Sequence, residues 1–146
     1  MSDCELSCKK RWLKEKNQTV SILRKLRKAY CEGEDSKYYA KIDEELGNLY
    51  EYGLSFDYVA PGTFTRQNEG YWRYQISYGG PSDEFRFYAS GPDCDCYRIE
   101  YVFLDWYDGH KRALKGKDLE LLKEIWSWFQ DGGTTEIEFN KALEEY

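Results

Sequence analysis

An alternation of large and polar residues over residues 71–106 constrains this chain more than any other feature of its sequence. Every second residue of the run 71–78 is large and mostly apolar: Trp72, Tyr74, Ile76 and Tyr78. A period of two is typical of a β-strand, because successive side chains of a strand point to opposite faces. The runs 84–89 and 97–106 alternate in the same way, and turn-forming segments separate the three runs. The pattern predicts an antiparallel β-meander.

The alternation also predicts which residues of neighbouring strands face each other. A slip of one residue would move every side chain to the other face, so the apolar faces must be matched. Matching them predicts four facing pairs: Ile76 with Phe85, Tyr74 with Phe87, Phe85 with Tyr101, and Phe87 with Ile99. Residues 79–82 then form the first hairpin loop, and SGPDCDC forms the second.

The opposite face of the predicted sheet is polar. The predicted register arranges it in three rows: Gln75–Arg86–Glu100, Arg73–Tyr88–Arg98, and Ser77–Glu84–Val102. Arg86 and Glu100 are placed for a cross-strand ion pair, and Tyr88 lies between two arginines, as cation–π stacking requires. A solvated face is the ordinary interpretation, since antiparallel sheets often expose one side to water. A surface that binds a ligand or a partner is the alternative.

Helical periodicity flanks the predicted sheet on both sides. The pattern predicts a basic helix over residues 1–33, a second helix over 35–52, four strands within 54–106, and helices within 117–146. The segment YDGHKRALKGK after the last strand is expected to be a loop. The length of 146 residues is usual for one domain, 1–146. The expected fold class is α+β: an antiparallel four-stranded β-meander packed with N-terminal and C-terminal helices.

Charge is distributed unevenly along the chain. Residues 1–30 hold nine of the 21 Lys and Arg residues but three of the 27 Asp and Glu residues. A basic first helix therefore precedes an acidic body. The helix offers four candidate contacts to nucleic-acid phosphates: Arg24, Lys25, Arg27 and Lys28. The acidic body argues against nucleic-acid binding by the whole chain, and an acidic surface can instead compete for the basic groove of a nucleic-acid-binding protein.

The cysteines indicate a reduced, cytoplasmic protein without a cofactor. The chain has five cysteines, an odd number that rules out complete internal pairing. Cys4 and Cys8 are four residues apart, and Cys94 and Cys96 two apart, but these spacings are unlike those of zinc sites. Free thiols are therefore expected, with no metal. A nucleophilic pair of Cys94 or Cys96 with His110 has no local signature in its favour. The chain shows no signal peptide and no membrane segment.

Carboxylates near strand ends are the remaining candidates for chemistry. Asp105 lies between Leu104 and Trp106, in a run expected to be mostly buried, which favours a paired carboxylate or one that caps the following turn. We favour the structural role. An enzyme would require a buried cleft in which Asp57, Asp105 and Arg98 converge.

Three segments in the C-terminal two-thirds of the chain carry a resemblance to known proteins. They are YGLSFDYVAPGTFT (52–65), EGYWRYQISYGGPSDEFRF (69–87) and RIEYVFLDWYDG (98–109). These segments look like those of a family of small proteins encoded on bacterial plasmids, phages and integrative elements. The family brings no catalytic residues to this chain. Small acidic proteins of such elements are often anti-defence factors, such as anti-CRISPR or anti-restriction proteins, so the resemblance implies that function.

These observations lead to one hypothesis and one alternative. The expected function is that of a non-enzymatic protein from a mobile genetic element, which binds and inhibits a host defence nuclease or complex. No small-molecule substrate is expected. The expected partner-binding residues lie on the polar face and in nearby loops: Arg73, Gln75, Asp83, Glu84, Arg86, Tyr88, Arg98, Glu100 and Asp108. The alternative is a nucleic-acid-binding accessory protein of plasmid maintenance that uses the basic helix.

Overall fold

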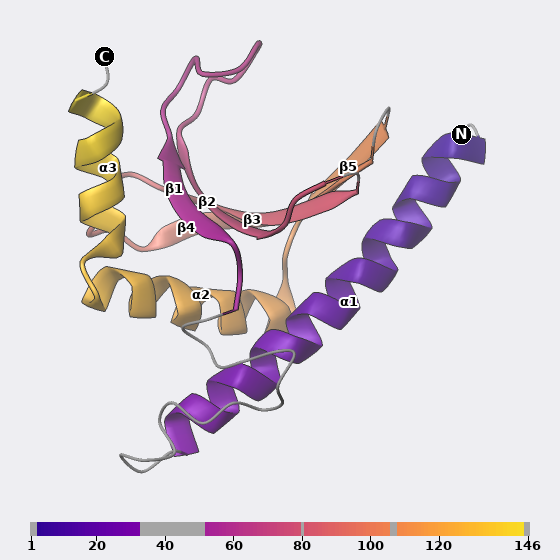
Figure 1. Ribbon diagram of the computed structural model, residues 1–146, viewed down its shortest axis with the longest axis horizontal. Coiled ribbons are helices and arrows are strands. Elements are labelled where there is room, and N and C mark those ends of the chain that lie inside the picture. Colours follow the sequence, from indigo (N-terminus) through magenta and orange to yellow (C-terminus); the bar gives the residue numbers. More distant parts are fainter. Residues whose placement is uncertain (1–2, 33–51, 80, 106–107, 145–146) are drawn as a thin grey trace. The chain divides into compact units, whose positions relative to one another are not determined.

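The computed structural model describes residues 3–32, 52–79, 81–105 and 108–144 (Figure 1). The chain divides into two compact units, Met1–Gly53 and Leu54–Tyr146. The helix expected over 35–52 lies, apart from its last residue, outside the described residues. The expectation of a single domain stays a prediction.

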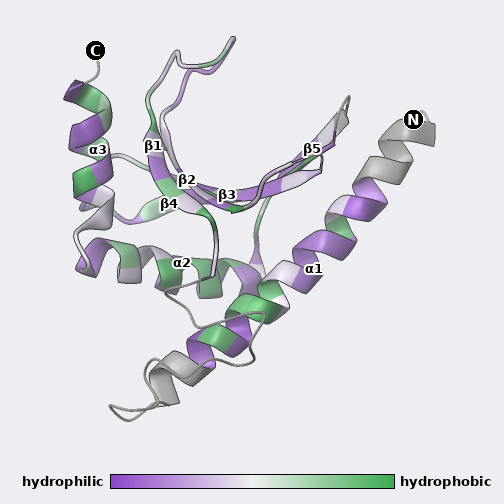
Figure 2. Cartoon of the chain, viewed as in Figure 1, coloured by the Kyte–Doolittle hydropathy of each residue, from purple (hydrophilic) through white to green (hydrophobic). Residues whose placement is uncertain are grey.

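The first unit contains the predicted basic helix, α1 (Asp3–Glu32), as one continuous element of 30 residues. Its buried residues recur at helical spacing along one side: Trp12, Thr19, Val20, Leu23 and Leu26. Lysines and arginines occupy much of the remaining surface, and Figure 2 shows both hydrophobic and hydrophilic residues along the helix. The helix therefore has one buried side and one cationic side.

The second unit is built on an antiparallel sheet with five strands in sequential order. The strands are β1 (Ser55–Val59), β2 (Tyr71–Ser77), β3 (Ser82–Ala89), β4 (Cys96–Asp105) and β5 (Asp108–Ala113). The α+β class and the meander are confirmed, but the prediction of four strands is one short. β5 falls in the segment that was expected to be a loop. Within the described residues it is an edge strand that pairs with β4 alone, so it lacks the apolar alternation that predicted the other strands.

The predicted register is correct for one hairpin and wrong for the other. Phe85 faces Tyr101 and Phe87 faces Ile99, as the alternation predicts. Between β2 and β3, however, Tyr74 faces Phe85, because the pairing is displaced by two residues from the prediction. An even displacement leaves every side chain on its predicted face, so alternation alone cannot detect it. A bulge between Gln75 and Ser77 adds a further irregularity near the turn.

The aromatic face of the sheet is covered by α2 (Gly116–Asp131) and α3 (Thr134–Glu144) (Figures 1 and 2). Trp126 of α2 is 1% exposed, and its ring lies 5.1 Å from Trp72 and 5.4 Å from Phe87. Phe129 stacks on Phe56 with ring centroids 4.0 Å apart. From α3, Phe139 lies 5.8 Å from Trp72. Aromatic pairs at these distances bury large surfaces and form the core of the unit.

Helix side chains also hold the loop that carries Cys94. Trp126 Nε1 and Gln130 Nε2 both donate hydrogen bonds to the carbonyl oxygen of Cys94, at 3.0 and 2.9 Å. Gln130 Nε2 and Thr135 Oγ1 donate to the carbonyl oxygen of Pro92, each at 3.0 Å. These bonds satisfy loop carbonyls that the β-ladder cannot reach. The loop between β3 and β4 is thus fastened to the helices by side chains, which gives it a structural role.

We expect Trp126→Ala to lower the free energy of unfolding by about 3–5 kcal/mol, because it leaves a cavity between sheet and helix and removes a loop hydrogen bond. Urea denaturation followed by circular dichroism measures the loss. Ile137→Ala, at a residue of α3 that is 62% exposed, is the matched control and should change stability by no more than about 0.5 kcal/mol. Equal losses in the two variants would contradict the packing described here.

Candidate functional site

The sheet face opposite α2 and α3, here called the polar sheet face, carries the candidate site. Strand pairing arranges it in three rows: Val59–Tyr71–Tyr88–Arg98, Asp57–Arg73–Arg86–Glu100–Ala113, and Ser55–Gln75–Glu84–Val102–Lys111. Arg86 and Glu100 share a row, as predicted. Gln75 lies beside Glu84 instead, and Arg73 beside Arg86, because of the two-residue displacement between β2 and β3.

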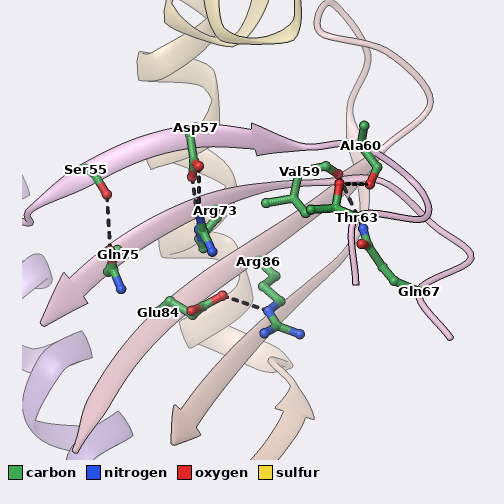
Figure 3. A network of polar contacts seen from close by, with 10 residues as sticks. All are labelled: Ser55, Asp57, Val59, Ala60, Thr63, Gln67, Arg73, Gln75, Glu84 and Arg86. Carbon is green, nitrogen blue, oxygen red and sulfur yellow. Dashed lines mark hydrogen bonds and ion pairs between the residues drawn. The ribbon is translucent and has the colours of Figure 1, made fainter. Parts of the chain in front are cut away.

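Ion pairs fix two of the arginines in place (Figure 3). Arg73 donates two hydrogen bonds to Asp57, from Nε to Oδ1 at 3.0 Å and from Nη2 to Oδ2 at 2.7 Å. This bonding to Asp57 raises the pKa of Arg73. Arg86 Nε donates to Glu84 Oε2 at 2.8 Å, so its partner is on its own strand and the expected pair with Glu100 is not formed. Glu84 is 4% exposed, which makes this a largely buried interaction.

Glu100 and Arg98 are instead organised around Tyr88. The Tyr88 hydroxyl donates to Glu100 Oε1 at 2.8 Å, and burial together with this bond raises the pKa of Tyr88 to about 12. The Arg98 guanidinium lies 4.0 Å from the centre of the Tyr88 ring, so the predicted cation–π contact is confirmed for this arginine. The second arginine of the predicted row, Arg73, is paired with Asp57 instead, and Arg86 stacks on Tyr71, at 4.7 Å. Two guanidinium planes are therefore held against two tyrosine rings.

The loop between β1 and β2 borders this face and is ordered by hydrogen bonds of its own side chains, those of Thr63 and Gln67 among them. Gln67 accepts a hydrogen bond from the backbone N–H of Phe64 at 3.0 Å and donates to the carbonyl oxygen of Glu69 at 2.9 Å. Within this loop Arg66 has a φ of 62°, a left-handed conformation that is uncommon for any residue other than glycine. The loop thus presents Arg66 and Glu69 from a defined backbone.

The loop and the sheet together enclose a half-open cavity of about 480 Å³. Its lining combines cations, aromatic rings and one carboxylate: Phe64, Thr65, Arg66, Gln67, Asn68, Glu69, Tyr71, Arg86, Tyr88, Arg98 and Lys111. Arg98 Nη2 forms an ion pair with Glu69 across it. A site of this composition can bind an anionic or hydrogen-bonding group, because three guanidinium groups and one ammonium group belong to residues that line one space.

Six of the nine predicted partner-binding residues lie outside the lining of this cavity: Arg73, Gln75, Asp83, Glu84, Glu100 and Asp108. Asp83 is 6% exposed and accepts hydrogen bonds from Tyr101 and Ser77, so its carboxylate is buried where we expected it in an accessible loop. Glu84 is also buried, and its carboxylate forms the ion pair with Arg86. Asp108 begins β5 opposite Asp105 and helps to form the last hairpin.

The thiols and the histidine are not brought together. Cys96 is buried at the start of β4, and burial raises the pKa of its thiol to about 12. Cys94 is exposed in the preceding loop, and His110 faces Phe103 near the far end of β4. Seven residues of extended strand separate Cys96 from Phe103, which is about 23 Å. Cys4 and Cys8 lie in α1, and their side chains fall outside the described residues.

The carboxylates do not form the cleft that an enzyme would need. Asp57 is on β1 and paired with Arg73, and the strands β2 and β3 lie between it and Arg98. Asp105 closes the β4–β5 hairpin, seven residues along the strand from Arg98. Within the described residues, no three side chains of histidine, cysteine, aspartate or glutamate are grouped as metal ligands.

Eight of the eleven lining residues were not among the predicted site residues, and four of these eight are charged residues or tyrosine: Arg66, Glu69, Tyr71 and Lys111. Tyr71 could have been found, because the alternation that buries Trp72 places its neighbour on the polar side. Lys111 was missed because β5 was not predicted. Arg66 and Glu69 are positioned by the hydrogen bonds of Gln67, and no periodicity signals such a loop.

Comparison of the chain with models of protein families, with curated proteins and with solved structures found no match. Among the described helices, none has the length and apolar character needed to cross a membrane.

We expect Tyr88→Phe to lower the free energy of unfolding by about 1 kcal/mol near neutral pH, because Glu100 loses a hydrogen bond. The raised pKa of Tyr88 stabilises the folded protein fully below its ordinary value of 10.0, and this contribution is lost as pH rises through about 12. The wild-type protein should therefore lose more stability than Tyr88→Phe over that window.

Urea denaturation at several pH values from about 8 to about 12 tests this difference. Tyr97→Phe is the matched control, because Tyr97 is an exposed tyrosine of the same sheet. It should follow the wild-type curve. A Tyr88→Phe curve parallel to that of the wild type would contradict the role of the hydroxyl.

Proposed function

We propose that the protein is a non-enzymatic binding protein that inhibits a host defence nuclease or complex by protein–protein contact. The polar sheet face carries this proposal. Its arginines and tyrosines are held by Asp57, Glu84 and Glu100 before any partner arrives. Side chains that are already ordered lose little conformational entropy on binding, which favours affinity. Arginine and tyrosine are also enriched among the residues that dominate binding energy at protein interfaces.

The inhibitory role follows from the resemblance to small proteins of plasmids, phages and integrative elements. An inhibitor needs a surface that competes with or blocks its target, and requires no reacting groups of its own. The net charge of −6 is compatible with occupying a basic groove that otherwise binds nucleic acid. In that arrangement the polar sheet face provides directed hydrogen bonds, and the overall charge speeds the encounter.

Capture of host proteins on the immobilised full chain, from an extract that contains CRISPR effectors and restriction enzymes, tests this proposal. We expect Arg98→Lys to weaken the captured complex by at least about tenfold, because lysine keeps the charge but loses the planar fork and the stacking on Tyr88. Lys117→Gln, an exposed change on α2, is the control and should bind like the wild type. Failure to retain a defence protein, together with no protection of phage or plasmid, would exclude the function.

The cationic side of α1 favours a second candidate, a nucleic-acid-binding accessory protein. Lys10, Lys14, Lys25 and Lys28 are all exposed and lie opposite the buried residues of the helix. They extend along about 27 Å of helix, far enough to follow several phosphates. Arg24 is exposed as well, whereas Arg27 is half-buried at the margin of the stripe.

We expect this stripe, if it binds DNA, to show affinity that falls steeply with salt. Neutralising Arg24, Lys25, Arg27 and Lys28 together should reduce the slope of log affinity against log salt by about 0.9 for each phosphate that the variant no longer binds. Fluorescence anisotropy with a labelled duplex measures both quantities. A variant with Lys115, Lys117, Lys123 and Lys141 changed to Gln, all exposed positions outside α1, removes the same four charges and controls for the change in net charge. No binding at low salt would exclude this candidate.

A further inference from the structure

Two cations of the cavity beside the polar sheet face have no acidic partner among the described residues. Arg66 projects from the β1–β2 loop and Lys111 from β5, and both line the cavity. Within the part of the chain that the structure describes, neither side chain has an acidic partner. The other two cations of the lining, Arg86 and Arg98, are paired with carboxylates. The cavity therefore combines a fixed pair of arginines with two cations that remain available.

The hydrogen bonding of Arg98 is also incomplete. Its Nη2 contacts Glu69, but its Nε is buried and has no hydrogen-bond partner. The nearest carboxylate oxygen, Glu100 Oε2, lies 3.7 Å from Nε, which is too far for a hydrogen bond. A buried donor without an acceptor is unfavourable, and a small rotation of the guanidinium toward an entering acceptor would satisfy it.

The charge of the cavity matches a single negative group. Four cations line it, and three carboxylates lie in its wall or directly beneath: Glu69, Glu84 and Glu100. One positive charge is left over. A monoanionic carboxylate would neutralise that charge, whereas a phosphate dianion would leave an excess of negative charge in a half-buried space. The rings of Phe64, Tyr71 and Tyr88 offer apolar contact to the methylene groups that carry such a carboxylate.

We propose that this cavity is a carboxylate-binding site, and that it accepts an acidic side chain of the protein partner. Arg66 and Lys111 supply the charge that attracts the carboxylate, and the stacked Arg98 supplies a planar fork that orients it. The identity of the carrier as a protein rests on the proposed function. The site itself depends only on the cavity.

The backbone of Arg66 provides a way to test the site without harming the fold. Arg66 adopts a left-handed φ of 62°, which costs free energy for any residue that has a Cβ atom. Arg66→Gly removes the guanidinium and relieves this strain, so the variant should be at least as stable as the wild type. A loss of binding in this variant therefore reports the missing charge and not unfolding.

The experiment is a titration of the full chain followed by the ¹H–¹⁵N resonances of the arginine Nε groups. The probe is the capped peptide acetyl-Gly-Glu-Gly-amide, and the matched control is acetyl-Gly-Gln-Gly-amide. We expect saturable shifts of the Arg98 Nε resonance with the glutamate peptide and at most about a tenth of that effect with glutamine. Arg66→Gly and Lys111→Gln should each weaken binding several-fold, and Lys117→Gln should leave it unchanged.

The proposal would be overturned by equal binding of the two peptides, by binding unaffected by Arg66→Gly, or by inorganic phosphate that binds at least about tenfold more tightly than the glutamate peptide. A titration with acetate at equal concentration distinguishes a site for free carboxylates from one that binds the side chain of a peptide. Tighter binding of acetate than of the glutamate peptide would overturn the assignment to a protein side chain. Peptide binding without any captured defence protein would contradict the proposed function alone. A captured partner whose binding is unchanged by Arg66→Gly would contradict the carboxylate-binding site alone.

Discussion

The packing of Trp126 against Trp72 and Phe87 is the interaction on which the rest of the second unit depends. It joins the first helix after the sheet to β2 and to the central strand β3, and it determines which face of the sheet is buried. Because strand side chains alternate, burying one face leaves the arginines and tyrosines on the other. The indole N–H also binds the loop that precedes β4. One residue thus connects the core, a loop and, indirectly, the orientation of the candidate site.

The polar sheet face is organised by a different kind of interaction. Its buried or half-buried charges are each matched by a neighbour, as with Arg73 and Asp57, or Arg86 and Glu84. Such pairs contribute little net stability, because desolvation offsets much of their attraction. Their value lies in geometry, since they hold guanidinium planes where a partner can meet them. The pairs therefore fix the geometry of this face more than they stabilise the fold.

Alternation predicts much of the fold, but it does not determine the register of every strand pair and it does not reveal β5. The period of two places Phe85, Phe87 and Tyr101 on the buried face, and the structure agrees. It cannot distinguish registers that differ by two residues, which is why the predicted pairing of Tyr74 with Phe87 is wrong. It also misses β5, because an edge strand exposed to water has no reason to alternate.

The strand residues of the candidate site could also be predicted from alternation, whereas its loop residues could not. Arg86, Tyr88, Arg98 and Glu100 were assigned to one face by their position in the strands, and the structure places all four there. The cavity itself was not predicted, because its wall depends on the hydrogen bonds of Gln67 and on the left-handed backbone of Arg66. Loop conformations of this kind arise from side-chain bonding to the backbone, and a residue pattern does not encode them.

The bulge in β2 has a consequence for how the chain can change over evolutionary time. Gln75 and Ser77 face consecutive residues of β3, so Ile76 is the extra member of the strand. A chain that lacked one residue at this position would pair the two strands regularly and would keep Arg73 and Arg86 side by side. Relatives can therefore differ in length by one residue here without altering the face that the strands present.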